Sequence, residues 1–118
     1  MNNIENNGGP LFVKPFSTEH EINSNLTSEE AFFLNKHLDK YSSICLNNEG
    51  KKNKQHLFYF NKYVKKYEHV ILIGKSCCDI LKIEYKEWDK NEVGWCIPPL
   101  SRIMGSSAKI KEFVKVVE

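Results

Sequence analysis

The stretch VILIGK at residues 70–75 decides the fold class of this 118-residue chain. Four consecutive branched apolar side chains with no polar residue between them are typical of a central strand covered on both faces. Gly74 then permits a tight turn, and residues 76–81 fit a short helix. Before the strand, apolar residues recur at helical spacing over residues 55–67. The pattern predicts a helix, a buried strand and a second helix in succession.

Further strands are predicted on both sides of this unit. Residues 11–13 form a short apolar extended segment bounded by prolines at 10 and 15. Residues 43–46 have the composition of a short buried strand that ends at a polar turn. Residues 93–97 form another strand, which a pair of prolines closes. A mainly parallel arrangement follows if helices separate these strands.

Sequence signals for the start of a helix lie between the first two predicted strands and after the last one. Thr27 followed by Glu30 is a capping-box signature, and Ser106 or Ser107 can cap a C-terminal helix. Strands that alternate with helices predict βαβ units and right-handed crossovers. We therefore expect an α/β fold, a small three-layer sandwich with a mostly parallel sheet of three to four strands flanked by helices.

Length and composition are those of one globular domain. The apolar fraction is 41% and the charged fraction is 27%, which is typical of a folded protein. We expect a single domain over residues 11–118 and a flexible, Asn- and Gly-rich segment over residues 1–10. The chain has no apolar run of the ~20 residues that span a bilayer and no secretory signal. These features indicate a cytoplasmic protein, and the excess of Lys and Asn suits a low-GC bacterium or its phage.

The balance of charges gives weak support to nucleic-acid binding. The formal net charge is +2, and Arg102 is the sole arginine among seventeen basic residues. Lysine neutralises phosphate as a point charge, whereas arginine can read a base in bidentate fashion, so sequence-specific duplex reading is disfavoured. The basic turn and this arginine could contact phosphate, or they could simply be solvated. The candidate phosphate or nucleic-acid contacts are Lys51, Lys52, Lys54 and Arg102.

Three loops are expected at the carboxyl ends of the strands, where ligands bind in open α/β sheets. They are residues 47–54, 74–78 and 98–107. The second loop contains Gly-Lys-Ser at residues 74–76, which are the last three residues of the phosphate-loop motif. His69 occupies the position of the first glycine of that motif, so the motif is not fulfilled. Two interpretations of this loop remain: a weak anion-binding site at Lys75, or a simple βα turn with a solvated lysine.

Three short motifs carry a family resemblance: CLN at residues 45–47, ILIGK at 71–75 and CIPPLS at 96–101. In order and spacing they resemble the uracil-DNA glycosylase superfamily. Its members carry a strand ending in Leu-Leu-Asn, an apolar strand ending in Gly-Lys or Gly-Arg, and a strand ending in His-Pro-Ser-Pro-Leu-Ser. The resemblance covers roughly residues 29–117 and implies a pocket for a nucleotide base at the strand ends.

Carried over residue by residue, Asn47 matches the amide that reads the base. Such an amide can donate to a carbonyl and accept from a ring N–H, although an Asx turn is the simpler interpretation. The segment from Pro99 to Ser101 matches the loop that presses on the DNA backbone, or it terminates a strand and caps a helix. The loops and the resemblance together give these ligand-binding candidates: Asn47, Gly74, Lys75, Ser76, Pro99 and Ser101.

Two departures from the family argue against catalysis. Cys96 stands in place of the catalytic histidine and cannot stabilise a leaving base in the same way. The family's first strand and its water-activating acid also have no evident counterpart before the first helix. We therefore expect that catalysis is lost and that binding of a nucleotide-type ligand or nucleic acid is retained. The alternative is a divergent DNA glycosylase that removes a damaged base, with Glu19 or Glu21 as the acid.

A third possibility is a protein-binding module, such as a phage-type inhibitor, with an aromatic surface around Tyr59, Tyr63 and Trp88. A small parallel sheet leaves an edge exposed, which favours a homodimer. The four histidines and four cysteines lack metal-ligand spacing, so we expect neither a metal nor a cofactor. Cys77 and Cys78 lie at a helix start, where a thiol pKa can fall, but no partner base accompanies them.

Overall fold

The computed structural model describes residues 8–17, 26–48, 51–52, 60–62 and 64–118. Within these residues, the sheet has five strands in the order β3-β2-β1-β4-β5. The strands are β1 (Leu11–Ser17), β2 (Ser42–Asn48), β3 (Lys51–Lys52), β4 (Val70–Ile73) and β5 (Trp95–Ile97). The pairs β2–β1, β1–β4 and β4–β5 are parallel, and the two-residue β3 is antiparallel to β2. The expected small α/β domain with a mostly parallel sheet is confirmed.

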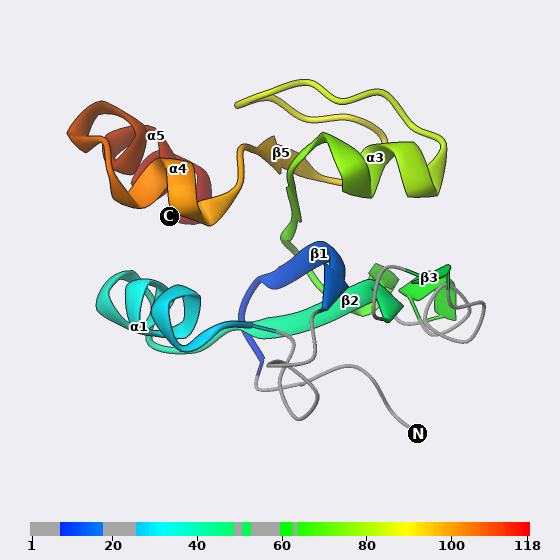
Figure 1. Cartoon of the computed structure of the whole chain (residues 1–118), viewed down its shortest axis with the longest axis horizontal. Helices are drawn as coiled ribbons and strands as arrows, with labels where there is room; N and C mark the ends of the chain where they lie inside the picture. The colour runs from blue at the N-terminus through cyan, green and yellow to red at the C-terminus, as the bar shows by residue number, and fades with distance from the viewer. Residues whose placement is uncertain (1–7, 18–25, 49–50, 53–59, 63) are drawn as a thin grey trace.

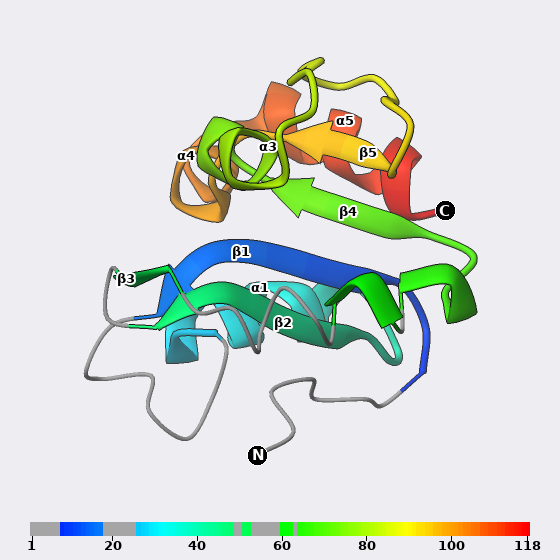
Figure 2. The same ribbon diagram turned by 90° about the vertical axis from the view of Figure 1, so that its right-hand side faces the viewer.

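Helices cover both faces of the sheet and produce three layers. One face packs against α1 (Ser28–His37), α4 (Leu100–Met104) and α5 (Ser107–Val117), which lie together in Figure 1. The other face packs against α3 (Lys75–Leu81), the helical residues 60–62 and the 3-10 helix η2 (Val64–Lys66) (Figure 2). Both faces of β4 are therefore buried, as its uninterrupted apolar sequence predicts.

The predicted capping box forms at the start of α1. The Thr27 hydroxyl accepts a hydrogen bond from the Glu30 amide at 3.1 Å, and the Glu30 carboxylate accepts one from the Thr27 amide at 2.9 Å. Two backbone donors that the helix cannot satisfy internally thus find partners. Leu34 lies on the buried face of this helix.

The central strand β1 is longer than the segment predicted at residues 11–13, because Pro15 does not end it. Leu11 donates to His69 on the β4 side, and Pro10 accepts from Ser42 on the β2 side. Along β1, the backbone groups of successive residues point alternately to β2 and to β4, so the position of Pro15 faces β4. The pairing of β1 with β4 has already ended at Val13, so the N–H that Pro15 lacks is not needed there. The predicted extended segment at residues 11–13 is therefore the start of a seven-residue central strand.

The segment from Gly8 to Pro10, which we expected to be flexible, is attached to the start of β2. The Ser42 hydroxyl donates to the Gly8 carbonyl at 2.9 Å, and the Ser42 amide donates to the Pro10 carbonyl at 2.8 Å. The rest of the expected flexible segment lies outside the described residues.

Helix α4 lies within the stretch of residues 98–107 that we predicted to be a loop. No side chain caps it, because its N-cap residue is Pro99, and it has only five residues. Leu100 and Ile103 are nevertheless completely buried against the sheet. Tertiary packing, and not a local start signal, explains this helix.

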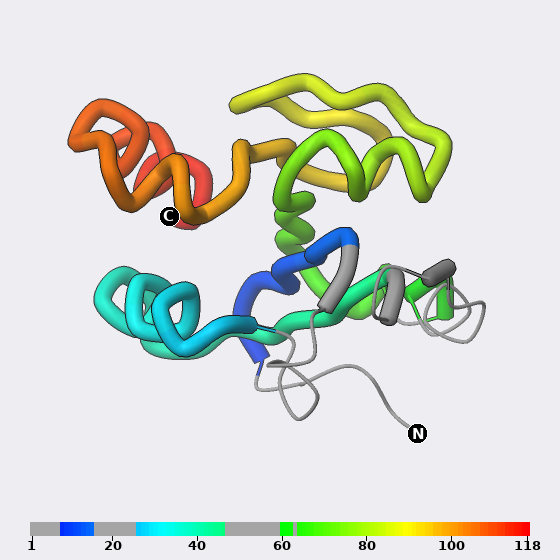
Figure 3. The backbone as a smooth tube through the Cα atoms, in the orientation of Figure 1, coloured from blue at the N-terminus to red at the C-terminus, as the bar shows by residue number. Residues whose placement is uncertain are grey.

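Strand β5 is shorter than predicted and its outer edge is covered. The Asn91 side chain accepts hydrogen bonds from the amides of Val93 and Gly94, which hold these residues in a turn. The chain before this turn folds back along β5 (Figure 3), where Trp88 donates to the Cys96 carbonyl and Cys96 donates to the Asp89 carbonyl. The open edge on which the homodimer prediction depends is thus occupied at β5.

Within the described part of the chain, no helix has both the length and the apolar character needed to cross a membrane.

Candidate ligand site at the carboxyl edge of the sheet

The strand registers place the predicted loops at one level along one edge of the sheet. Phe16 pairs with Asn47, and Ile73 pairs with Ile97. Because β1 and β4 pair at Leu11 and Val70, Lys75 leaves the sheet at the level of Phe16. The turns after β2, β4 and β5 therefore emerge on the same side, as expected for parallel strands.

The strand order reverses between β1 and β4, which defines a topological switch point. From β1 the chain proceeds to β2 on one side, and from β4 it proceeds to β5 on the other. The helices that follow these strands, α1 and α3, cover opposite faces of the sheet. In doubly wound folds this divergence opens a crevice at the carboxyl ends, where ligands bind.

Gly74 and Pro99 join the turns after β4 and β5. The Gly74 amide donates to the Ile97 carbonyl at 2.7 Å, and a side-chain carbon built on Gly74 would lie 3.7 Å from the Pro99 ring. Gly74 has a φ of +84° and a ψ of 159°, a backbone conformation that is essentially restricted to glycine. The backbone conformation of this turn therefore requires glycine, whereas a side-chain carbon at this position would lie only at ordinary contact distance from Pro99.

The polar candidates beside this contact are accessible to solvent. Lys75 and Ser76 on one turn, and Ser101 and Arg102 on the other, are all exposed. The Lys75 ammonium lies 3.8 Å from the Asp79 carboxylate, but both side chains are more than half exposed. Such a surface pair is weak, so Lys75 can also contact an external anion.

The structure does not bring all predicted contacts together. The backbone of Asn47 lies two strands away from β4, roughly 10 Å across the sheet, and its side chain is outside the described residues. The backbones of Lys51 and Lys52 form the far edge strand β3, and Lys54 lies outside the described residues. Arg102 follows β5, about 19 Å from β3 across four strand spacings. Arg102 and the basic turn thus form two separate sets.

An ion pair between the middle of β1 and the first turn of α1 was not predicted from the sequence. The Lys14 ammonium lies 2.8 Å from the Glu30 carboxylate, and the two side chains are only 11% and 14% exposed. The same carboxylate completes the capping box, so it connects β1 to α1 beside the switch point. The sequence feature that could have predicted this ion pair is a lysine next to an apolar strand segment. Side chains alternate between the two faces of a strand, and this alternation places Lys14 on a buried face, where a charge needs a partner.

The residues proposed for the alternative functions are only partly described. Glu19 and Glu21 lie outside the described residues, as do Tyr59 and Tyr63. Trp88 is half-buried and packs against the core on the α1 face. It therefore offers less aromatic surface than a protein-binding role around this residue requires.

All four cysteines are buried. The Cys77 thiol donates to the carbonyls of Val13 and Ile73, at 3.1 Å each. The Cys78 and Cys96 sulfurs lie 3.8 Å apart, and the Asn91 amide group is 3.4 Å from the Cys96 sulfur. Burial, and secondarily the neighbouring Cys78, raises the pKa of Cys77 well above its ordinary value. Burial and then Cys96 raise the pKa of Cys78 to about 12, so proximity to a helix start does not activate these thiols.

We predict that the native protein resists thiol modification. At pH 8 a thiol with a pKa of about 12 is ionised in about one molecule in 10⁴, and the thiolate is the reactive form. The reaction of native protein with an aromatic disulfide reagent should be at least about 100-fold slower than that of protein unfolded in guanidinium, which should expose four thiols. Rapid reaction of even one thiol in the native protein would contradict this packing.

The described residues contain no group of three or more His, Cys, Asp or Glu side chains placed to hold a metal ion. Comparison of the chain with protein-family models, with curated proteins and with solved structures finds no match. The class that the fold defines is a doubly wound α/β domain, and any assignment of function depends on the site itself.

Proposed function

We propose that this domain binds a nucleotide-type ligand or nucleic acid, without catalysis, at the carboxyl edge of its sheet. The observation that carries the proposal is that the turns after β4 and β5, joined by the hydrogen bond from the Gly74 amide to the Ile97 carbonyl, lie next to the switch point. Ligands of doubly wound sheets bind at this location. The resemblance of this chain to uracil-DNA glycosylases supports a nucleotide as the ligand.

The polar groups at this edge have separate proposed roles. Lys75 supplies a positive charge for a phosphate, and the hydroxyls of Ser76 and Ser101 can donate to its oxygen atoms. Asn47 would contact the base from the β2 end of the same edge. The separation of roughly 10 Å between the strands that carry Asn47 and Lys75 suits a ligand with a base at one end and a phosphate at the other.

The position of Cys96 supports binding without catalysis. Its side chain is completely buried in the core cluster on the α3 face. A thiol there cannot contact a ligand at the edge, whereas the histidine of the similar enzymes acts on the departing base.

We predict that Lys75→Glu weakens binding. In thermal-shift and calorimetric titrations with mononucleotides, cyclic dinucleotides and a single-stranded oligonucleotide, a ligand at 100 times its Kd should stabilise the protein by about 2.7 kcal/mol. Reversal of the charge at Lys75 should raise the Kd at least about tenfold, a loss of about 1.4 kcal/mol. Lys65→Glu is the matched control, because this exposed lysine lies in η2, before the amino end of β4. Failure of every ligand to stabilise the protein would contradict the proposal.

One observation favours the alternative of a divergent glycosylase. The central strand β1 ends at Ser17, beside the switch point. Glu19 and Glu21 follow Ser17 within four residues of the sequence. The family carries its water-activating acid after its first strand. Release of free base from DNA that contains uracil or hypoxanthine, and its loss in Glu19→Gln or Glu21→Gln, would decide for this alternative.

A further inference from the structure

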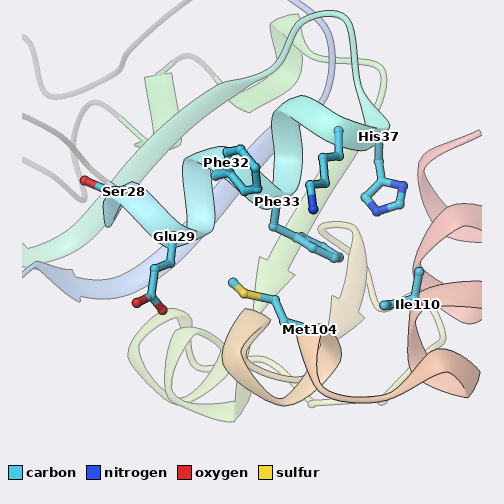
Figure 4. A pocket seen from close by; sticks show the side chains of 8 residues that line it. Ser28, Glu29, Phe32, Phe33, His37, Met104 and Ile110 are labelled. Atoms are coloured by element: carbon cyan, nitrogen blue, oxygen red, sulfur yellow. The ribbon is translucent and has the colours of Figure 1, made fainter.

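A hollow of about 590 Å³ lies between α1 and the pair α4–α5 (Figure 4). Its wall is largely apolar: Phe33 and Met104 point into the space between the helices, and Ile110 lies beside them. Charged and polar groups occur at both ends of the α1 side. The residues that line the hollow are Ser28, Glu29, Phe32, Phe33, Lys36, His37, Met104 and Ile110.

Phe32 is the exposed large apolar residue of this surface. Its side chain is 63% exposed, and no other large hydrophobic residue in the described part of the chain is classed as exposed. The Lys36 ammonium lies 4.5 Å from the centre of the Phe32 ring, so this charge is held over the same helix face. An exposed aromatic beside an apolar hollow is a common feature of protein interfaces.

Two exposed charges of α1, Glu29 and Lys36, lie symmetrically about the centre of the helix. Glu29 lies three residues before Phe32, and Lys36 lies three residues after Phe33. Residues 29 and 36 are seven apart, two helical turns, and therefore share one face. Glu29 and Lys36 are both exposed, and no ion pair engages Glu29 among the described residues. If a second α1 packs against the first in antiparallel orientation, each glutamate faces a lysine of the other helix.

We propose that the hollow is the interface of a two-fold symmetric homodimer, with a second copy of this chain as its occupant. Phe32 of each copy enters the hollow beside Phe33 and Met104 of the other. Glu29 of each copy pairs with Lys36 of the other, which gives two equivalent ion pairs. A two-fold interface must be self-complementary, and the charge pattern of α1 fulfils that requirement. This surface is distinct from the proposed ligand site and does not depend on it.

The test exploits the symmetry through two charge reversals. Glu29→Lys leaves two lysines on the face, and Lys36→Glu leaves two glutamates, so each variant alone should repel itself. We expect wild-type protein to dimerise in sedimentation velocity at micromolar to millimolar concentration, and each variant to raise the dimer dissociation constant at least about tenfold. An equimolar mixture of the two variants should form a heterodimer, because every cross-pair is then attractive. Lys65→Glu, on the opposite face, should dimerise like the wild type.

Each other outcome overturns the proposal. A wild-type protein that remains monomeric over the whole range excludes the second copy as occupant and leaves a different protein or a small apolar ligand. A dimer that both reversals leave intact lies on another surface. Variants that dissociate but do not associate when mixed exclude the antiparallel pairing, provided that their circular dichroism shows a folded protein.

Discussion

Replacement of Glu30 by alanine is expected to lower the free energy of unfolding by about 3–5 kcal/mol. The substitution leaves the Lys14 ammonium, which is 11% exposed, without the carboxylate that lies 2.8 Å away. It also removes the acceptor for the Thr27 amide at the start of α1, and the loss of a cap alone costs about 1 kcal/mol. Urea denaturation at neutral pH measures the effect.

Two variants separate the ion pair from other effects of this substitution. Glu29→Ala changes the adjacent, exposed carboxylate in the same turn and should cost less than about 1 kcal/mol. The double variant Lys14→Met with Glu30→Gln removes both charges and should recover most of the loss, since an apolar replacement of a buried pair is often neutral. A loss below about 1 kcal/mol for Glu30→Ala would show that this ion pair does not stabilise the protein.

Gly94→Ala is the second substitution with a large expected effect. A side-chain carbon at Gly94 would overlap the backbone carbonyl of Val70, and backbone atoms of a central strand cannot move aside easily. We expect a loss of about 1–3 kcal/mol or more, because β5 would be displaced from β4. The midpoint of urea denaturation should decrease accordingly.

Gly105→Ala is the matched control for this prediction. No atom lies within 4 Å of the added carbon, and the φ of −88° is accessible to alanine. This variant should be unchanged or more stable by up to about 1 kcal/mol. Equal denaturation midpoints for the Gly94 variant and the wild type would contradict the close approach of β4 and β5.

The elements with strong local signals could be predicted from the sequence. The apolar run of β4 and the capping box at Thr27 are both present, because a buried strand and a helix start each depend on adjacent residues. Helix α4 has no such signal, since packing of Leu100 and Ile103 stabilises it. The extent of β1 beyond Pro15 was also unpredictable, because it depends on which strand lies on each side.

Part of the candidate site could also be predicted from the sequence. Parallel strands bring their carboxyl ends to one edge, so the common level of the three turns follows from the alternation of elements. The hydrogen bond from Gly74 to Ile97 requires β4 and β5 to be neighbours, which the sequence does not specify. The pairing of Lys14 with Glu30 and the hollow beside Phe32 likewise depend on how distant segments pack.

Mapping of a bound nucleotide by heteronuclear NMR tests the central claim most directly. Titration of isotope-labelled protein with the tightest-binding nucleotide should shift the amide signals of Gly74, Lys75, Ser76, Ser101 and Arg102 in a saturable manner. Signals of Lys65 at the opposite edge and of Phe32 beside the hollow should not change. Saturable shifts confined to those two regions, or no saturable shift with any nucleotide, would contradict a ligand site at the carboxyl edge of the sheet.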